Sequence, residues 1–156
     1  MPKPQTDLLK GLTDEEAARV LALGTPITLP AGESLFRLGE TAERMYLLRS
    51  GRIHLTLPIP IRGHDEDVLI EERLAGETVG WSGLIPPHRF TLNATAPVAT
   101  DVTAFPRSVL LEHFAANPAV ASLVMRNVAS VIGHRLQVFQ TMWTREMQRS
   151  VELKYS

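Results

Sequence analysis

The apolar residues that follow Pro118 recur at helical spacing. Their steps of three or four residues keep them near one face of a helix. Proline is favoured in the first turn of a helix, and no other proline follows Pro118. We therefore predict one helix from Pro118 to about Ser150, on the order of 50 Å long. The apolar stripe consists of Val120, Val124, Val128, Ile132, Leu136, Phe139, Trp143 and Met147.

Before Pro118 the pattern changes to short apolar runs separated by proline and glycine. This pattern is typical of β-strands joined by turns. Ser50-Gly51 separates two such runs and predicts a tight hairpin, whereas Pro58, Pro60 and Gly63 predict a longer exposed loop. The predicted strands are Pro26–Leu29, Ser34–Arg37, Arg44–Arg49, Ile53–Pro58, Val68–Arg73, Thr91–Thr95 and Thr100–Ala104.

Two shorter helices flank the predicted strands. Thr13 and Glu16 have capping-box spacing before AARVLAL, and Gly24 is placed to end that helix. A second short helix is predicted over 106–114. This order predicts a mainly β fold with flanking helices, a double-stranded β-helix jelly roll. We expect residues 1–117 to form the first helix and the jelly roll, and residues 118–156 to form the long helix and a short tail.

Composition and charge narrow the class of protein. The chain has 156 residues, a net charge of -1 and no cysteine, which suits one globular domain and argues against a strongly basic nucleic-acid binder. We find no apolar run long enough to span a bilayer and no signal peptide, so we expect a cytoplasmic protein with no membrane partner.

The sequence carries no recognisable catalytic pattern. The five histidines lack the His-x-His spacing of a jelly-roll metalloenzyme. No ordered Ser/His/Asp set, phosphate-loop lysine or carboxylate pair stands out. We therefore predict that the protein is not an enzyme, and we assign no catalytic residue and no metal ligand.

Four stretches carry a resemblance to a known family. They are LPAGESLFRLGE at 29–40, MYLLRSGRI at 45–53, GETVGWSGL at 76–84 and ATA at 94–96. Together they resemble the cyclic-nucleotide-binding domain of the catabolite-activator (CRP/FNR-like) and kinase regulatory-subunit superfamily, over about residues 7 to 145. The GWS…PP-x-R-aromatic pattern is similar to stand-alone bacterial members of that superfamily. Glycines 32, 39, 51 and 76 fall where turns need a positive φ.

The resemblance implies a ligand site, the phosphate-binding cassette, over residues 79–96. In the superfamily a glutamate after a glycine holds the ribose, and an arginine before Ser/Thr neutralises the phosphate. Aligning on Ala94-Thr95-Ala96 places Trp81 at the glutamate position and Phe90 at the arginine position, while Thr91 keeps its place. Arg89 lies one residue early and can substitute only if the strand starts late or bulges. The cassette residues that we single out are Gly80, Trp81, Ser82, Gly83, Leu84, Arg89, Phe90 and Thr91.

These departures leave three interpretations of the cassette open. Trp81 and Phe90 fill the ligand space as a closed core, or they wall a pocket for another planar ligand, or a cyclic nucleotide binds in a changed way. No cofactor is assigned beyond that possible cyclic nucleotide or other small ligand. For any anion, the expected donors are the amides of residues 81–84 and the hydroxyls of Ser82 and Thr91.

The resemblance also implies that the long helix pairs with a second copy in a dimer. The spacing of Val128, Ile132, Leu136, Phe139, Trp143 and Met147 is compatible with such a seam. About six residues follow the predicted helix, too few for a helix-turn-helix, so we expect no direct DNA binding. Two functions remain: a non-catalytic sensor that signals through this helix, or a ligand-free subunit that docks on and assembles a partner protein or enzyme complex.

Overall fold

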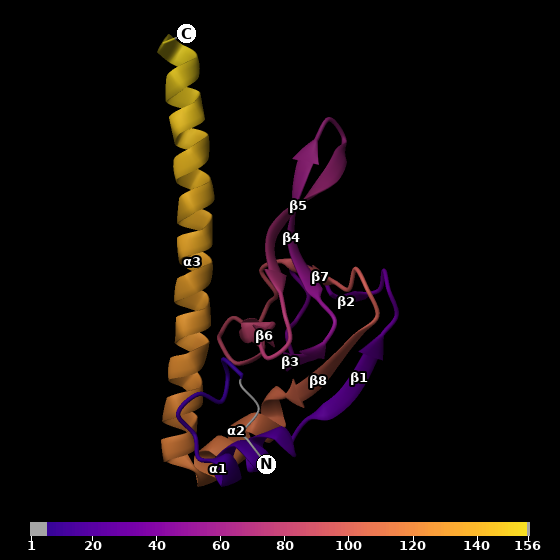
Figure 1. Cartoon of the computed structure of the whole chain (residues 1–156), viewed down its shortest axis with the longest axis vertical. Helices are drawn as coiled ribbons and strands as arrows, with labels where there is room; N and C mark the ends of the chain where they lie inside the picture. Colours follow the sequence, from indigo (N-terminus) through magenta and orange to yellow (C-terminus); the bar gives the residue numbers. More distant parts are fainter. Residues whose placement is uncertain (1–5, 156) are drawn as a thin grey trace.

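Two antiparallel sheets of four strands each form a roll, with two short helices at its base and one long helix that rises beside it (Figure 1). The computed structural model describes residues 6–155. One sheet has the order β1-β8-β3-β6 and the other has the order β2-β7-β4-β5. This architecture confirms the predicted jelly roll. The strands are β1 (Thr25–Leu29), β2 (Ser34–Phe36), β3 (Arg44–Ser50), β4 (Ile53–Ile61), β5 (His64–Arg73), β6 (Thr78–Val79), β7 (Asn93–Thr95) and β8 (Thr100–Pro106).

Three α-helices and one short 3₁₀ turn complete the part of the chain that the structure describes. They are α1 (Asp14–Leu21), η1 (Trp81–Gly83), α2 (Arg107–Ala116) and α3 (Pro118–Tyr155). The capping box of α1 is confirmed, because the Glu16 amide donates to Thr13 Oγ1 and the Thr13 amide donates to Glu16 Oε1. Gly24 does not end α1, which stops at Leu21. Its role is close packing, since a Cβ there would lie 2.2 Å from Thr103 Cγ2.

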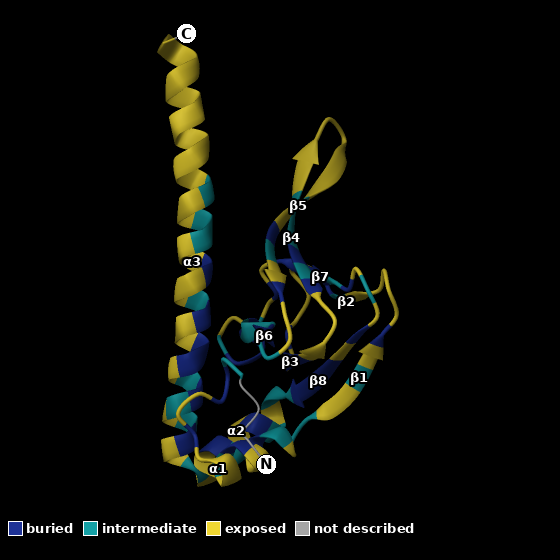
Figure 2. Ribbon diagram, viewed as in Figure 1, coloured by how far each residue is buried: buried dark blue, intermediate teal, exposed yellow. Residues whose placement is uncertain are grey.

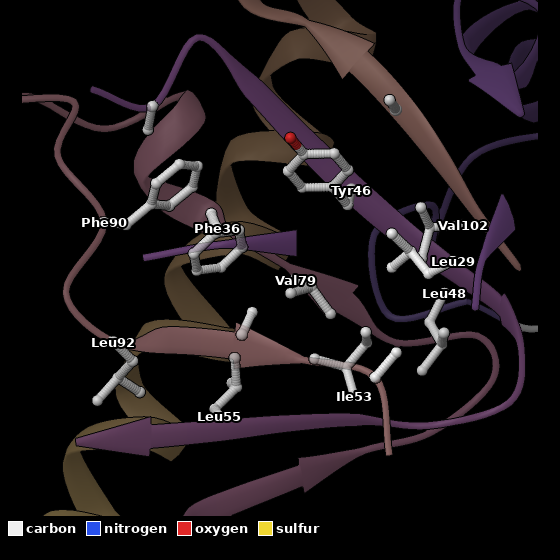
Figure 3. Close-up of a cluster of buried hydrophobic side chains, with 14 of the residues drawn as sticks. Leu29, Phe36, Tyr46, Leu48, Ile53, Leu55, Val79, Phe90, Leu92 and Val102 are labelled. Carbon is white, nitrogen blue, oxygen red and sulfur yellow. The ribbon is translucent and has the colours of Figure 1, made fainter. Parts of the chain in front are cut away.

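Two hydrophobic clusters hold the fold together. The first lies between the two sheets and includes Phe36, Leu48 and Leu55 (Figure 3). The second joins the helices to the outer face of β3 and β8, through residues such as Met45 and Phe105. Valines 120, 124 and 128 of α3 belong to this second cluster, so the first half of the long helix is part of the core.

The β4–β5 hairpin corrects the prediction of a long loop around Pro58, Pro60 and Gly63. Both strands continue to a tight turn, with Pro58 opposite Asp67 and Pro60 opposite Asp65. β7 pairs with β4 only over residues 54–56. The far half of β4 therefore has an open edge, where the missing N–H of a proline costs no ladder bond. The hairpin projects beyond the roll and rises alongside α3 (Figure 1).

The long helix is confirmed, and it runs past the predicted end near Ser150 to Tyr155. Its burial changes along its length: one face of the helix is covered from Val120 to Met142, and the residues beyond Met142 are exposed (Figure 2). The strand predicted to start at Thr91 starts instead at Asn93. That late start leaves residues 84–92 free of regular structure beside α3 and η1.

Candidate ligand site

The predicted cassette lies in one place, between the open side of the roll and α3. It begins with Gly80, which has a φ of +78° and precedes η1. A Cβ at Gly80 would lie 3.1 Å from Phe90 Cε1 and 3.2 Å from Phe36 Cε2. Both the positive φ and this close approach require glycine. The turn therefore brings backbone directly against two aromatic rings.

Phe90 occupies the interior of the cassette. Its side chain is 6% exposed, and its ring stacks on Phe36 with centroids 3.7 Å apart and planes within 7° of parallel. Tyr46 continues the row, with its ring centroid 6.0 Å from that of Phe36. Figure 3 shows the three rings side by side above Leu55 and Leu92. Burial raises the pKa of the Tyr46 phenol above its ordinary value. The position where the resemblance implies an arginine is thus a stacked core aromatic.

Little space remains around that ring. The residual cavity has a volume of about 10 Å³, which is about the room one water needs. Trp81 lines the same cavity, and its half-buried side chain packs against the second cluster. The cavity lining consists of Phe36, Leu55, Gly80, Trp81, Ser82, Phe90, Thr91, Leu92 and Arg135. Phe90 therefore fills the interior, whereas Trp81 lies at the wall of the cavity and packs toward the helices.

Arg89 stays at the rim and does not line the cavity. Its backbone pairs with Thr41, and its exposed guanidinium donates from Nη1 to the Gly39 carbonyl at 3.0 Å. The strand does start late, as the substitution of Arg89 for the missing arginine required. The side chain nevertheless points to the Gly39 turn, so Arg89 supplies no charge to the cassette interior.

The expected anion donors are partly engaged. The amides of Gly83 and Leu84 donate to the carbonyls of Gly80 and Trp81 within η1, at 3.0 Å each. The structure therefore leaves at most the amides of Trp81 and Ser82 for an anion. Ser82 is buried, and its carbonyl lies 3.0 Å from Nδ1 of His88, whereas Thr91 is exposed.

The predicted dimer residues do not share one environment. Val128 is fully buried within its own chain and has no surface to offer a second copy, so we remove it from the seam. Ile132 packs partly against the second cluster, and Phe139 packs partly against the first. The residues that remain open are Leu136, Trp143 and Met147, which are 68%, 66% and 43% exposed.

One charged residue of the site was missed at the sequence level. Arg135 lies on α3, lines the residual cavity and is only 7% exposed. Its Nε donates to Oε2 of Glu71 on β5 at 2.5 Å. A signal was present in the sequence, because Arg135 lies seven residues after Val128 and three after Ile132, which places it on the face of the apolar stripe.

Within residues 6–155, no group of three or more His, Asp or Glu side chains is arranged to hold a metal ion. In the same part of the chain, none of the helices combines the length and apolar character that crossing a membrane requires.

Comparison with known proteins places the fold. Residues 26–117 match the cyclic nucleotide-binding domain family. The chain is similar to Glutaminase 1 of Bradyrhizobium diazoefficiens, with 30% identity over 135 residues that cover 84% of this chain. Those residues span about a fifth of that relative's length, 20%.

Solved structures share the same architecture. A cyclic nucleotide-binding domain from Methylobacillus flagellatus has a TM-score of 0.78 and 17% identity, covering 89% of this chain and 82% of the other. The catabolite activator protein of Thermus thermophilus has a TM-score of 0.70 and 24% identity, covering 96% of this chain and 63% of the other. These likenesses establish the jelly roll with its long helix.

Proposed function

This chain belongs to the cyclic nucleotide-binding domain family, and we propose that it is a non-catalytic regulatory module whose cassette has diverged from nucleotide binding. The observation that carries the proposal is the Phe90 ring, stacked on Phe36 and leaving about 10 Å³ of free space. Small-molecule pockets generally have about 300–1,000 Å³. A nucleotide could enter only after Phe90 left the core.

The charge of the cassette supports the same conclusion. Trp81 and Phe90 stand where the family resemblance implies a ribose-binding glutamate and a phosphate-binding arginine. Each lost charge-assisted hydrogen bond, or anion left unpaired, costs on the order of 1–3 kcal/mol. Two such losses correspond to roughly 30-fold to 20,000-fold weaker binding. Arg89 does not offset them, because its guanidinium is exposed and bonded to Gly39.

Helix α3 is the part of the chain best suited to transmit a signal. Leu136, Trp143 and Met147 are spaced by seven and four residues on its exposed face. Large exposed apolar side chains gathered in one stripe favour a protein partner. We propose that this stripe is the seam of a parallel homodimer and that α3 passes the state of the dimer to whatever protein the module regulates.

The curated relative supports a role beside an enzyme. The similar segment makes up only 20% of that glutaminase, so a domain of this kind accompanies a much larger chain there. We propose that the present domain likewise regulates or assembles a partner protein. Because its cassette is closed, no small molecule would control this role. The competing function is that of a sensor for another planar ligand. The observation that favours it is the half-buried side chain of Trp81, which is not enclosed in the core and could stack on such a ligand.

Thermal unfolding with cyclic AMP and cyclic GMP tests the cassette. A ligand present at 100 times its Kd would stabilise the fold by about 2.7 kcal/mol. At roughly 2–4 °C per kcal/mol, the midpoint would rise by about 5–11 °C. We expect no saturable rise with millimolar nucleotide. A saturable rise would mean that the cassette opens and that the module is a nucleotide sensor.

Light scattering tests the helix. We expect the particle mass to equal two chains at micromolar concentration. A mass of one chain would refute the dimeric output, whatever the nucleotides do.

A further inference from the structure

A buried ion pair connects α3 to the β-roll next to the cassette. Arg135 of α3 donates from Nε to Oε2 of Glu71 on β5 at 2.5 Å. The two side chains are 9% and 12% exposed. Arg135 also lines the cavity beside Phe90 and Trp81. The pair thus touches both the cassette and the helix that we propose carries the output.

A second arginine holds Glu71 in place. Nη1 of Arg73 lies 3.3 Å from Oε1 of Glu71, while its Nη2 lies 2.8 Å from Oδ2 of Asp7. Arg73 Nε and Nη2 also donate to the Thr78 carbonyl. Glu77 completes the group at 3.3 Å from Arg73 Nη1. The carboxylate that faces α3 is therefore fixed on the roll by contacts that do not involve the helix.

The pair makes the seated position of α3 a distinct state. Burial lowers the pKa of the Arg135 guanidinium, which Glu71 counteracts. A buried charge whose partner is removed is strongly unfavourable. The Arg135 guanidinium can therefore stay buried only while it contacts Glu71. If the helix moved part of the way out, the guanidinium would lose Glu71 before water could replace it, so such intermediate positions are unfavourable.

Few other contacts hold this part of the helix. On the same carboxylate, Nε2 of the exposed His134 lies 3.4 Å from Oε1 of Glu71. Val138, Phe139 and Met142 are only partly buried against the cluster between the sheets. Beyond Met142, all residues of α3 up to Tyr155 are exposed. Residues 135–142 are thus the last part of α3 attached to the roll, and Glu71–Arg135 is the buried polar contact within it.

We infer that the Glu71–Arg135 pair is an internal latch that fixes α3 against the roll in the absence of any ligand. Opening the latch releases α3 from about residue 132 onward and uncovers the Trp81 side of the cassette. This inference rests on the proposed function in one respect, namely that α3 transmits the signal to the regulated protein. The new element is that side chains of this chain, and no ligand, set the position of the helix.

Substitution of each partner tests the latch. Glu71→Gln and Arg135→Met should each raise hydrogen exchange in peptides covering 132–142 at least tenfold, while peptides covering 44–50 in β3 change less than twofold. Glu72→Gln is the matched control, because Glu72 is adjacent but exposed and paired with His54 and Arg52. Arg135→Lys keeps the charge and should restore part of the protection.

Fluorescence gives a second readout, since the chain has two tryptophans. In a Trp143→Phe background, Trp81 is the single reporter, and acrylamide quenching should increase at least twofold when Glu71→Gln is added. A uniform rise of exchange in all peptides would overturn the latch, because it would indicate global destabilisation. Equal behaviour of Glu71→Gln and Glu72→Gln would also overturn it.

The two proposals fail in different ways. A wild-type monomer or a nucleotide-induced shift would refute the proposed function and leave the exchange test of the latch intact. A dimer that ignores nucleotides but is unaffected by Glu71→Gln would refute the latch alone.

Discussion

Replacing Phe90 with alanine is the most direct test of a closed cassette. The ring is 6% exposed and stacked on Phe36, and the space beside it is about 10 Å³. The neighbours cannot collapse freely into the gap, because Phe36 and Leu55 are themselves fixed between the sheets. Phe90→Ala should therefore leave a real cavity rather than a repacked core.

The size of the effect follows from core deletions in general. Replacing a buried phenylalanine with alanine lowers the free energy of unfolding by about 3–5 kcal/mol. The loss of the ring stack with Phe36 places this site in the upper part of that range. A residual cavity of about 100 Å³ accounts for roughly 2.4 kcal/mol of the loss, at about 24 cal/mol per Å³. The unfolding midpoint should fall by about 6–20 °C.

Urea unfolding with and without benzene measures both the loss and the cavity. Apolar cavities of about 150 Å³ stay dry and bind benzene. Benzene should therefore restore part of the stability of Phe90→Ala and quench or shift the emission of Trp81, which lines the same space. Phe114→Ala is the control, because Phe114 is equally buried but belongs to the second cluster.

The reasoning would be refuted by a small effect. If Phe90→Ala lost less than about 1 kcal/mol while Phe114→Ala lost 3–5 kcal/mol, Phe90 would not fill a core site. The cassette would then be open in solution, and the proposal of a module without nucleotide control would fall with it.

Three further predictions concern the helix, the cassette turn and the aromatic row. Trp143→Asp should convert dimers to monomers in light scattering, whereas Thr141→Asp, exposed on the opposite face of α3, should not. Persistence of the dimer mass in Trp143→Asp would exclude Trp143 from the seam. Gly80→Ala should lower the free energy of unfolding in urea by at least about 1–3 kcal/mol, because the residue has a φ of +78° and the added Cβ would lie 3.1 Å from Phe90 Cε1. Gly133→Ala in α3, where the added Cβ meets open space, should raise the free energy of unfolding by about 0.5–1 kcal/mol. Equal effects of the two substitutions would contradict the packing argument. Burial raises the pKa of the Tyr46 phenol above 10.0, so the stability that the neutral phenol contributes is present below pH 10 and is lost as pH rises through the folded pKa. Tyr46→Phe should lack this alkaline loss of stability in unfolding curves recorded between pH 8 and 11. Identical curves for the two proteins would show that Tyr46 is not the group responsible.

Local sequence signals determined much of this protein. Thr13 and Glu16 form the capping box, and glycines 32, 39, 51 and 76 have the positive φ expected of their turns. The step of three or four residues after Pro118 specified α3. These features depend on backbone geometry and near neighbours in the chain, which a sequence displays directly. The two aromatic departures in the cassette were visible for the same reason.

Tertiary structure alone decided which surfaces are free. The sequence shows that Val128 and Leu136 lie on one stripe, yet Val128 is buried by the base of the roll and Leu136 is exposed. The continuation of β4 through Pro58 and Pro60 also depended on a partner, because prolines are tolerated only where β7 no longer pairs. Periodicity fixes the direction of a side chain but not what stands opposite it.

The Glu71–Arg135 pair makes the same distinction for charge. Sixty-four positions separate the two residues, and each one alone reads as an ordinary surface charge. Only the docking of α3 against β5 buries both side chains and makes Glu71 the partner that the Arg135 charge needs. The sequence therefore determined the elements and the two positions that depart from the family's ligand residues, while tertiary packing decided that Phe90 stacks on Phe36 and that Arg135 meets Glu71.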